Sequence, residues 1–249
     1  MNKKILHNSI KKVFLDLKDV EHFVFWELSS NDLYLKSLDV AYNTTILSSA
    51  KLRLPSYVDS SFVIKEPESL LKMIDIIEGD MVVDISLKNG SNFFTIKDET
   101  YEGNFVITDI NYIPDYILEK KMMQPEEPIS YDVQIPVNTS FVEKYVKAKK
   151  ANKSSLVSIW TKDRKTFFQL GENNSFTNKI KFSMEFDAMF DMEQLSFSAD
   201  LLQIVLERNK NAEGKIYIDP DGLMKLNFNE MVEGQNIETT YFIVAQDNI

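Results

Sequence analysis

Apolar residues recur three and four positions apart in four segments of the chain, which is the spacing of an amphipathic helix. The apolar stripe of the first segment consists of Leu6, Ile10, Val13, Phe14 and Leu17. Two of the other segments have start signals, Pro67 in a first turn and Asn138 at a cap position. The pattern predicts helices over residues 4–17, 67–77, 141–150 and 199–208.

Short alternating or aromatic-rich runs lie between these helices and predict strands. They cover residues 43–48, 61–65, 81–87, 91–97 and 104–110, then 131–137, 179–186, 194–197 and 237–245. Lys88-Asn-Gly90 and Asp219-Pro-Asp-Gly222 have the composition of hairpin turns. Each half of the chain therefore reads as an antiparallel sheet with two helices on one face, which is an α+β fold.

The two halves repeat one pattern. Trp26 and Trp160 each follow a lysine-rich helix and are 134 residues apart, and the Leu-Leu pairs that begin at Leu70 and Leu201 are 131 apart. The alternative is two unrelated domains that share a common helix-hairpin pattern. We predict two tandem similar domains, residues 1–113 and 131–249, joined by an extended connector over residues 114–130 that contains three prolines.

Composition limits the class of protein. With 44% apolar and 12% aromatic residues, the chain of 249 residues is too hydrophobic to be disordered and long enough for two cores. It has no cysteine, so disulfides and thiolate metal sites are excluded. No apolar run reaches the roughly 18–20 residues of a membrane span, and the start lacks a signal-peptide core. We expect a soluble, cytoplasmic protein with no membrane partner.

Positive charge is concentrated on the first helix of each repeat. The formal net charge is −10, yet residues 3–18 carry five lysines and one aspartate, a net of +4. Residues 141–153 again carry five lysines and one acidic residue, a net of +4, so the remaining residues hold −18. On a single helix such a row is usually a solvated face, but its recurrence in both repeats indicates a polyanionic partner.

This layout resembles the DNA sliding clamps, of the trimeric PCNA and phage type, over essentially the whole chain. The resemblance rests on the tandem helix-hairpin units with lysine-rich helices, Leu38-Asp39 before a strand, the long connector and the closing strand Thr240–Ala245. Residues 130–171 look closer to phage-type clamps than to cellular ones. The resemblance implies a homotrimeric ring that encircles duplex DNA and tethers the replicative DNA polymerase for processive synthesis, with a clamp loader as a further partner.

The resemblance also implies which basic residues face the DNA, through phosphate contacts that read no bases. These residues are Lys4, Lys11, Lys12, Lys18, Lys144, Lys147, Lys150, Arg208 and Lys210. Enclosure, not tight binding, would hold such a ring on DNA, so few lysines suffice.

Two further surfaces follow from the resemblance. Polymerase and loader peptides would enter an apolar pocket lined by Tyr42, Ile117, Leu118, Met122, Met123, Leu223, Tyr241, Phe242 and Val244. Polar Asn43, Thr44 and Thr45 depart there from the cellular pattern. Subunits would join through the edge strands 104–110 and 179–186, with Phe105, Ile107, Ile180 and Phe182 at the interface.

Other classes of function fit the residues less well. His7 and His22 are the only histidines, and no glycine-rich phosphate loop or HExxH motif occurs, so we predict no enzyme, no catalytic residue and no cofactor. Asp219-x-Asp221-Gly222 faintly resembles a calcium loop, but a hairpin turn explains it better and no metal is predicted. A non-ring accessory factor of replication or transcription with the same fold is the alternative, although it would have to be strongly basic to hold DNA.

Overall fold

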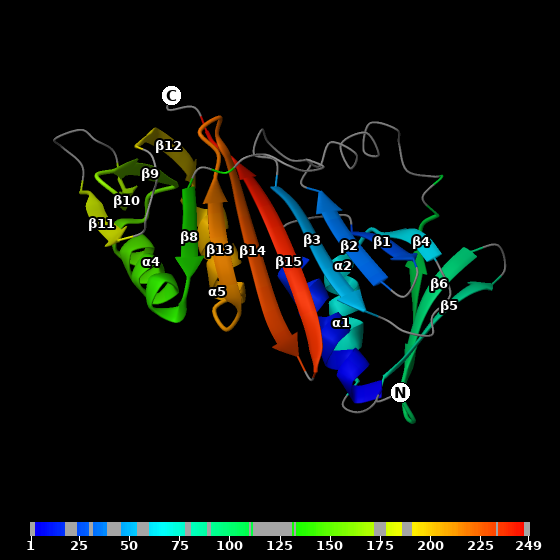
Figure 1. Ribbon diagram of the computed structural model, residues 1–249. Coiled ribbons are helices and arrows are strands. Elements are labelled where there is room, and N and C mark those ends of the chain that lie inside the picture. Colours follow the sequence, from blue (N-terminus) through cyan, green and yellow to red (C-terminus); the bar gives the residue numbers. More distant parts are fainter. Residues whose placement is uncertain are drawn as a thin grey trace. The chain divides into compact units, whose positions relative to one another are not determined.

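The computed structural model describes most of the chain as two compact units (Figure 1). The described residues are 3–17, 24–29, 32–38, 46–53, 60–77, 81–88, 91–109, 111, 131, 133–171, 178–185, 191–232 and 234–246. Unit 1 consists of Met1–Val40, Leu47–Gln124 and Asn229–Thr239. Unit 2 consists of Ala41–Ile46, Pro125–Phe228 and Thr240–Ile249. The predicted connector, 114–130, lies outside the described residues, so its boundaries stay a prediction.

Unit 1 contains two antiparallel sheets and two helices. Its elements are α1 (Lys3–Leu17), β1 (Val24–Ser29), β2 (Asp32–Leu38), β3 (Ile46–Arg53), β4 (Ser60–Ile64), α2 (Pro67–Asp75), β5 (Val82–Lys88), β6 (Ser91–Lys97) and β7 (Glu102–Ile107). One sheet has the order β4-β1-β2-β3 and the other the order β5-β6-β7. An isolated bridge between Val63 and Thr108 connects β4 to the end of β7.

Unit 2 repeats the helix-hairpin order. Its elements are β8 (Val133–Val137), α4 (Thr139–Asn152), β9 (Leu156–Lys162), β10 (Lys165–Leu170), β11 (Ile180–Glu185), β12 (Met192–Ser198), α5 (Ala199–Arg208) and β13 (Glu213–Ile218). The final hairpin, β14 (Leu223–Val232) and β15 (Gln235–Val244), contributes residues to both units. One sheet has the order β11-β10-β9-β12, and β14, β13 and β8 are neighbours in another.

The core of unit 1 forms where the apolar stripes of α1 and α2 meet the sheets. Ile10, Val13 and Phe14 of α1 are fully buried, together with Leu70 and Ile74 of α2. They share one cluster with residues of β4, β6 and β7. The helical spacing seen in the sequence is therefore the spacing of buried residues, and each such side chain contributes roughly 1.5–3 kcal/mol through burial.

The core of unit 2 is built in the same way, with better defined helix starts. Asn138 caps α4 by accepting a hydrogen bond from the backbone N–H of Phe141 at 2.9 Å, and Ser198 accepts from Leu201 at the start of α5. Tyr145 of α4 is fully buried, and its hydroxyl donates to the carbonyl of Ala199 at 3.1 Å. Burial raises the pKa of Tyr145 above its ordinary value, and the nearby carboxylate of Asp200 adds to the shift.

The segment Asp219–Gly222 is a hairpin turn between β13 and β14, as predicted. The backbone N–H of Asp219 donates to Leu223 at 2.8 Å, and that of Asp221 donates to the Asp219 carboxylate at 2.8 Å. Gly222 has a φ of 97°, which residues with a side chain rarely adopt. Among the described residues, no group of histidine, aspartate or glutamate side chains could hold a metal ion. Within the same residues, no helix is long and apolar enough to cross a membrane.

Candidate nucleic-acid and partner surfaces

Helix α4 presents a row of exposed lysines away from its buried stripe. Lys144, Lys147 and Lys150 are all exposed. The ammonium of Lys147 lies 3.5 Å from the Glu143 carboxylate in an exposed pair, which contributes little to stability. The ammonium of Lys144 lies 5.2 Å from the centre of the Phe182 ring. These three lysines therefore place positive charge on one surface of unit 2.

Lys149 behaves differently from its neighbours on α4. It is 7% exposed, and its ammonium lies 2.7 Å from the Asp200 carboxylate of α5. The count of basic residues in this helix therefore overstates its surface charge by one. The position could be read from the sequence, since Lys149 follows Tyr145 by four residues and so shares its side of the helix.

Helix α1 carries its lysines in another setting. The ammonium of Lys11 lies 2.5 Å from the Asp75 carboxylate of α2. That of Lys12 lies 3.1 Å from the Glu230 carboxylate, and the Lys12 side chain is only 15% exposed. Both lysines therefore have carboxylate neighbours, which reduce the charge they offer to a phosphate. The side chains of Lys4 and Lys18, also predicted to face DNA, lie outside the described residues.

The end of α5 contributes the other predicted basic residues. Arg208 is half-buried, and Lys210 is exposed just beyond the helix. Between them, Asn209 is buried and its amide donates to the carbonyl of Val205 at 2.9 Å and to the Tyr241 hydroxyl at 3.0 Å. This network fixes the end of the helix, so that Lys210 projects from an ordered turn.

Only part of the predicted peptide pocket falls on described residues. Tyr42, Ile117, Leu118, Met122 and Met123 lie outside them. Nothing in the structure therefore tests the predicted grouping of these side chains.

The described members of that pocket alternate along β15. Tyr241 is fully buried against Phe228, with ring centres 6.0 Å apart, whereas Phe242 is half-buried and Val244 is 38% exposed. Leu223 is half-buried at the start of β14. Any contact between Tyr241 and a peptide would therefore involve the strand backbone, while Phe242 and Val244 can offer side chains.

The two strands predicted to join subunits are terminal in their sheets, among the described strands. β7 ends the order β5-β6-β7, and β11 ends the order β11-β10-β9-β12. Apart from the bridge at Thr108, the described pairings of β7 are with β6, and those of β11 are with β10. Each strand therefore has an edge from which backbone groups can pair with another strand.

The side chains predicted for this interface point mainly into the units. Ile107 is 4% exposed, and Phe105 packs against the core of unit 1. Phe182 is 8% exposed and stacks on Phe168, with ring centres 5.2 Å apart, and Ile180 is half-buried. The strand alternation brings Val106 to the outside instead, where it is 61% exposed. The sequence prediction omitted this residue.

Solved structures match the chain along its whole length. PCNA from A. fulgidus, in a structure with the C-terminal region of FEN-1 bound, has a TM-score of 0.73 and 15% identity, covering 100% of this chain and 98% of that chain. PCNA from Entamoeba histolytica has a TM-score of 0.71 and 11% identity, covering 96% of each chain.

A bacterial protein matches the same length of this chain. The β subunit of DNA polymerase III from Pseudomonas aeruginosa has a TM-score of 0.70 and 10% identity, and the match covers 98% of this chain and 64% of that one. No protein-family model matches the sequence, and no curated protein matches it. The chain therefore has the α+β, two-domain fold of the DNA sliding clamps, as the sequence predicted.

Proposed function

We propose that this protein is a DNA sliding clamp, a homotrimeric ring that encircles duplex DNA and tethers a replicative DNA polymerase. The observation that carries the proposal is the match to A. fulgidus PCNA, which covers 100% of this chain and 98% of that one. A two-domain chain of the same extent needs three copies to make six domains, and the strand edges of β7 and β11 can pair head to tail between copies.

The contact with DNA is sequence-independent. Lys144, Lys147 and Lys150 of α4 approach phosphates, with Lys210 and Arg208 beside them and Lys4, Lys11, Lys12 and Lys18 in unit 1. The rest of the chain is acidic on average, which disfavours duplex DNA on most other surfaces. A ring of this kind performs no chemistry, so the proposed role is not enzymatic.

Partner proteins bind by a short peptide. One of the matching clamps was solved with the C-terminal region of FEN-1 bound, and another solved structure is a complex of PCNA2 with PCNA3 from Sulfolobus tokodaii. For this chain we propose that the polymerase and a clamp loader insert peptides between the connector and β15, where Phe242 and Val244 are accessible. The ring acts in the cytoplasm, that of the host if a phage encodes it.

The mass in solution tests the ring. Light scattering over a concentration series should show three chains of 28.9 kDa, about 87 kDa. Loading on nicked circular DNA should then survive dilution and be lost when the circle is cut, since a ring slides off a free end. A monomer at every concentration, unable to stay on circular DNA with any loader, would instead support the alternative, a non-ring accessory factor of the same fold.

A further inference from the structure

An aromatic pair covered by a lysine lies on the sheet face of unit 2 opposite helix α4. Phe168 contacts Phe141 of α4, with ring centres 5.3 Å apart, so its neighbour Phe167 projects from the other face. Phe167 stands directly opposite Trp160 in the β9–β10 register, and their rings stack with centres 5.3 Å apart at 16°. The ammonium of Lys181 lies 4.7 Å from the Trp160 ring centre and 4.4 Å from that of Phe167.

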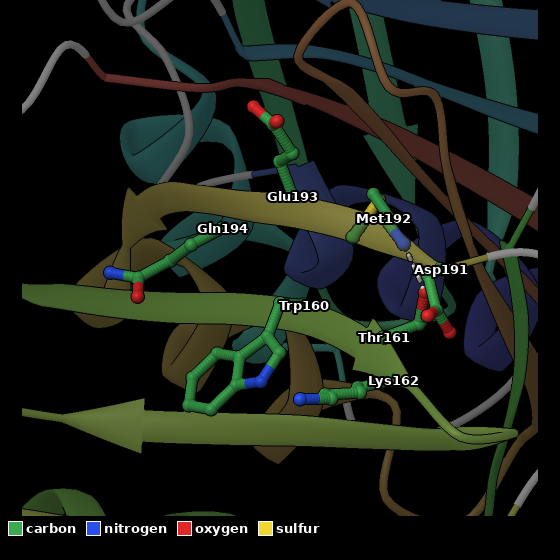
Figure 2. Close-up of a pocket in the computed structure, with 7 residues that line it drawn as sticks. All are labelled: Trp160, Thr161, Lys162, Asp191, Met192, Glu193 and Gln194. Carbon is green, nitrogen blue, oxygen red and sulfur yellow. Dashed lines mark hydrogen bonds between the residues drawn. The ribbon is translucent and has the colours of Figure 1, made fainter.

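A pocket of about 280 Å³ opens beside the indole of Trp160 (Figure 2). The pairing of β12 with β9 shifts between Met192 and Leu195, as in a β-bulge, so Glu193 and Gln194 together fall opposite Trp160, and both line the pocket. Gln194 lies beside the indole, whereas Glu193 points away from it (Figure 2). The carboxylate of Asp191 accepts a hydrogen bond from the backbone N–H of Asp163 at 3.1 Å. Among the side chains drawn in Figure 2, the charged one that extends toward the indole is that of Lys162.

The β9–β10 hairpin, which carries this face, has two features that destabilise it. Lys162 and Lys165 are directly opposite in the register, and like charges in that position repel each other. Between them, Asp163 and Arg164 both have positive φ values, 51° and 63°, and arginine is a poor residue for that conformation. β9, β10, β11 and the turn hold four basic and two acidic residues within a chain of net charge −10. Asp191 and Glu193 of β12 also line the pocket, so the positive charge that an anionic partner could contact is that of Lys162 and Lys181, next to the aromatic pair.

We propose that this face of β9–β11 binds single-stranded nucleic acid without sequence preference. A base stacks on the open side of Trp160, in the pocket, and Lys162 and Lys181 contact the flanking phosphates. An aromatic surface bordered by cations suits this ligand because every base has a flat π-face while the backbone supplies regular charge. An acidic peptide would use the lysines but not the open indole. The proposal goes beyond the sliding clamp function, since the surface lies opposite the helices proposed to face duplex DNA.

The fluorescence of Trp160 can be used to measure ligand binding at this site. In the variant Trp26→Phe, Trp160 is the only tryptophan, and titration with oligothymidylate at low salt should quench its fluorescence. Lys162→Glu and Lys181→Glu should each weaken binding by about tenfold. Each should also reduce the slope of log K against log[salt] by about 0.7, the value for one phosphate contact on a single strand. Fluorescence anisotropy of a labelled oligothymidylate measures the same dissociation constants in the protein that retains Trp26.

Lys225→Glu is the matched control. The ammonium of Lys225 also lies over an aromatic pair in unit 2, 5.8 Å from the Tyr131 ring centre and 5.9 Å from that of Tyr217. Lys225→Glu reverses the same charge in a similar cluster outside the proposed site. It should change the affinity for oligothymidylate by less than twofold.

Four outcomes overturn the proposal. The first is no quenching of Trp160 by oligothymidylate, and the second is an equal loss of affinity in Lys225→Glu. The third is quenching of Trp160 by a duplex of the same length with equal affinity. The fourth is displacement of the oligonucleotide by polyglutamate from a site with the same lysine dependence. The titration does not depend on ring formation. Quenching by a protein that stays monomeric would therefore support this site while the sliding clamp function fails.

Discussion

Helices α1 and α4 occupy the same place in the two repeats and carry the same number of lysines, yet they differ in the charge they present. Lys11 and Lys12 of α1 each lie close to a carboxylate of another element, Asp75 or Glu230. On α4, the lysines of the exposed row are Lys144, Lys147 and Lys150. Among the described residues, the carboxylate that pairs with this row is that of Glu143 on the same helix, 3.5 Å from the Lys147 ammonium.

The difference shows that a repeated charge pattern does not guarantee a repeated surface. Counted on the sequence, both helices have a net charge of +3, from four lysines and one acidic residue each. In the structure, carboxylates of other elements offset the charge of Lys11 and Lys12 of α1, whereas the carboxylate described beside the exposed row of α4 belongs to the same helix and forms an exposed, weak pair. If the protein encircles DNA, we expect α4 to make the larger contribution to DNA retention.

The largest expected effect is on DNA binding. Replacing Lys144, Lys147 and Lys150 with glutamate should lower affinity for duplex DNA by about a hundredfold at moderate salt, because about three phosphate contacts are lost. The salt slope should decrease by about 2.7, or 0.9 for each contact. Lys11→Glu with Lys12→Glu should have a smaller effect per residue. Filter binding across a salt series measures both, and equal losses per lysine would contradict the comparison.

Tyr145 gives a second contrast, since the corresponding residue of α1 is Phe14. The pKa of Tyr145 is raised by burial, so the folded protein keeps the phenol proton at pH values where the unfolded chain has lost it. The free energy of unfolding should therefore be unaffected by this group below pH 10 and fall above it, by about 1.4 kcal/mol per pH unit. Urea unfolding between pH 8 and pH 11 measures the slope.

The variant Tyr145→Phe makes α4 resemble α1 at this position. It should cost about 1 kcal/mol at neutral pH through the lost hydrogen bond to Ala199. The alkaline loss of stability should decrease in the variant. An unchanged slope above pH 10 would assign the alkaline sensitivity to other groups.

The buried lysine of α4 should matter for stability rather than for DNA. Asp200→Asn leaves the ammonium of Lys149 buried next to a neutral amide, which should cost about 1 kcal/mol, a modest value because Asp200 itself is largely exposed. Glu143→Gln, at the exposed pair with Lys147, is the matched control and should cost less than about 0.5 kcal/mol. Urea unfolding at neutral pH compares them, and equal costs would show that burial of Lys149 is unimportant.

The sequence was a good guide to local structure. Helix periodicity predicted the buried residues Ile10, Val13 and Phe14 of α1, and turn composition predicted the hairpin at Asp219–Gly222, because these features depend on neighbours within a few residues. The antiparallel α+β fold and its match to the sliding clamps are confirmed along the whole chain. Each of these features was visible as a period or a spacing.

The candidate sites were harder to predict because they depend on distant residues. Glu230 lies 218 positions after Lys12, and no local pattern connects them. The residues predicted for a subunit interface were a different case, because the strand period alone shows which side chains face outward. Alternation along β7 places Phe105 and Ile107 inward and Val106 outward. The period of two residues in a strand could therefore have identified Val106 as the outward-facing side chain from the sequence.

The smallest expected effect would remove the difference between the two helices. Asp75→Asn eliminates the carboxylate beside Lys11, in an exposed pair whose loss should change stability by less than about 1 kcal/mol. The released charge should raise duplex DNA affinity by about two- to fivefold, because Lys11 can then approach a phosphate. Glu68→Gln, which removes an exposed acidic residue from the same helix, controls for the change in net charge. Equal gains in both variants would mean that only overall charge matters, whereas a gain confined to Asp75→Asn would mean that the carboxylate screens Lys11 and makes α1 the weaker DNA surface.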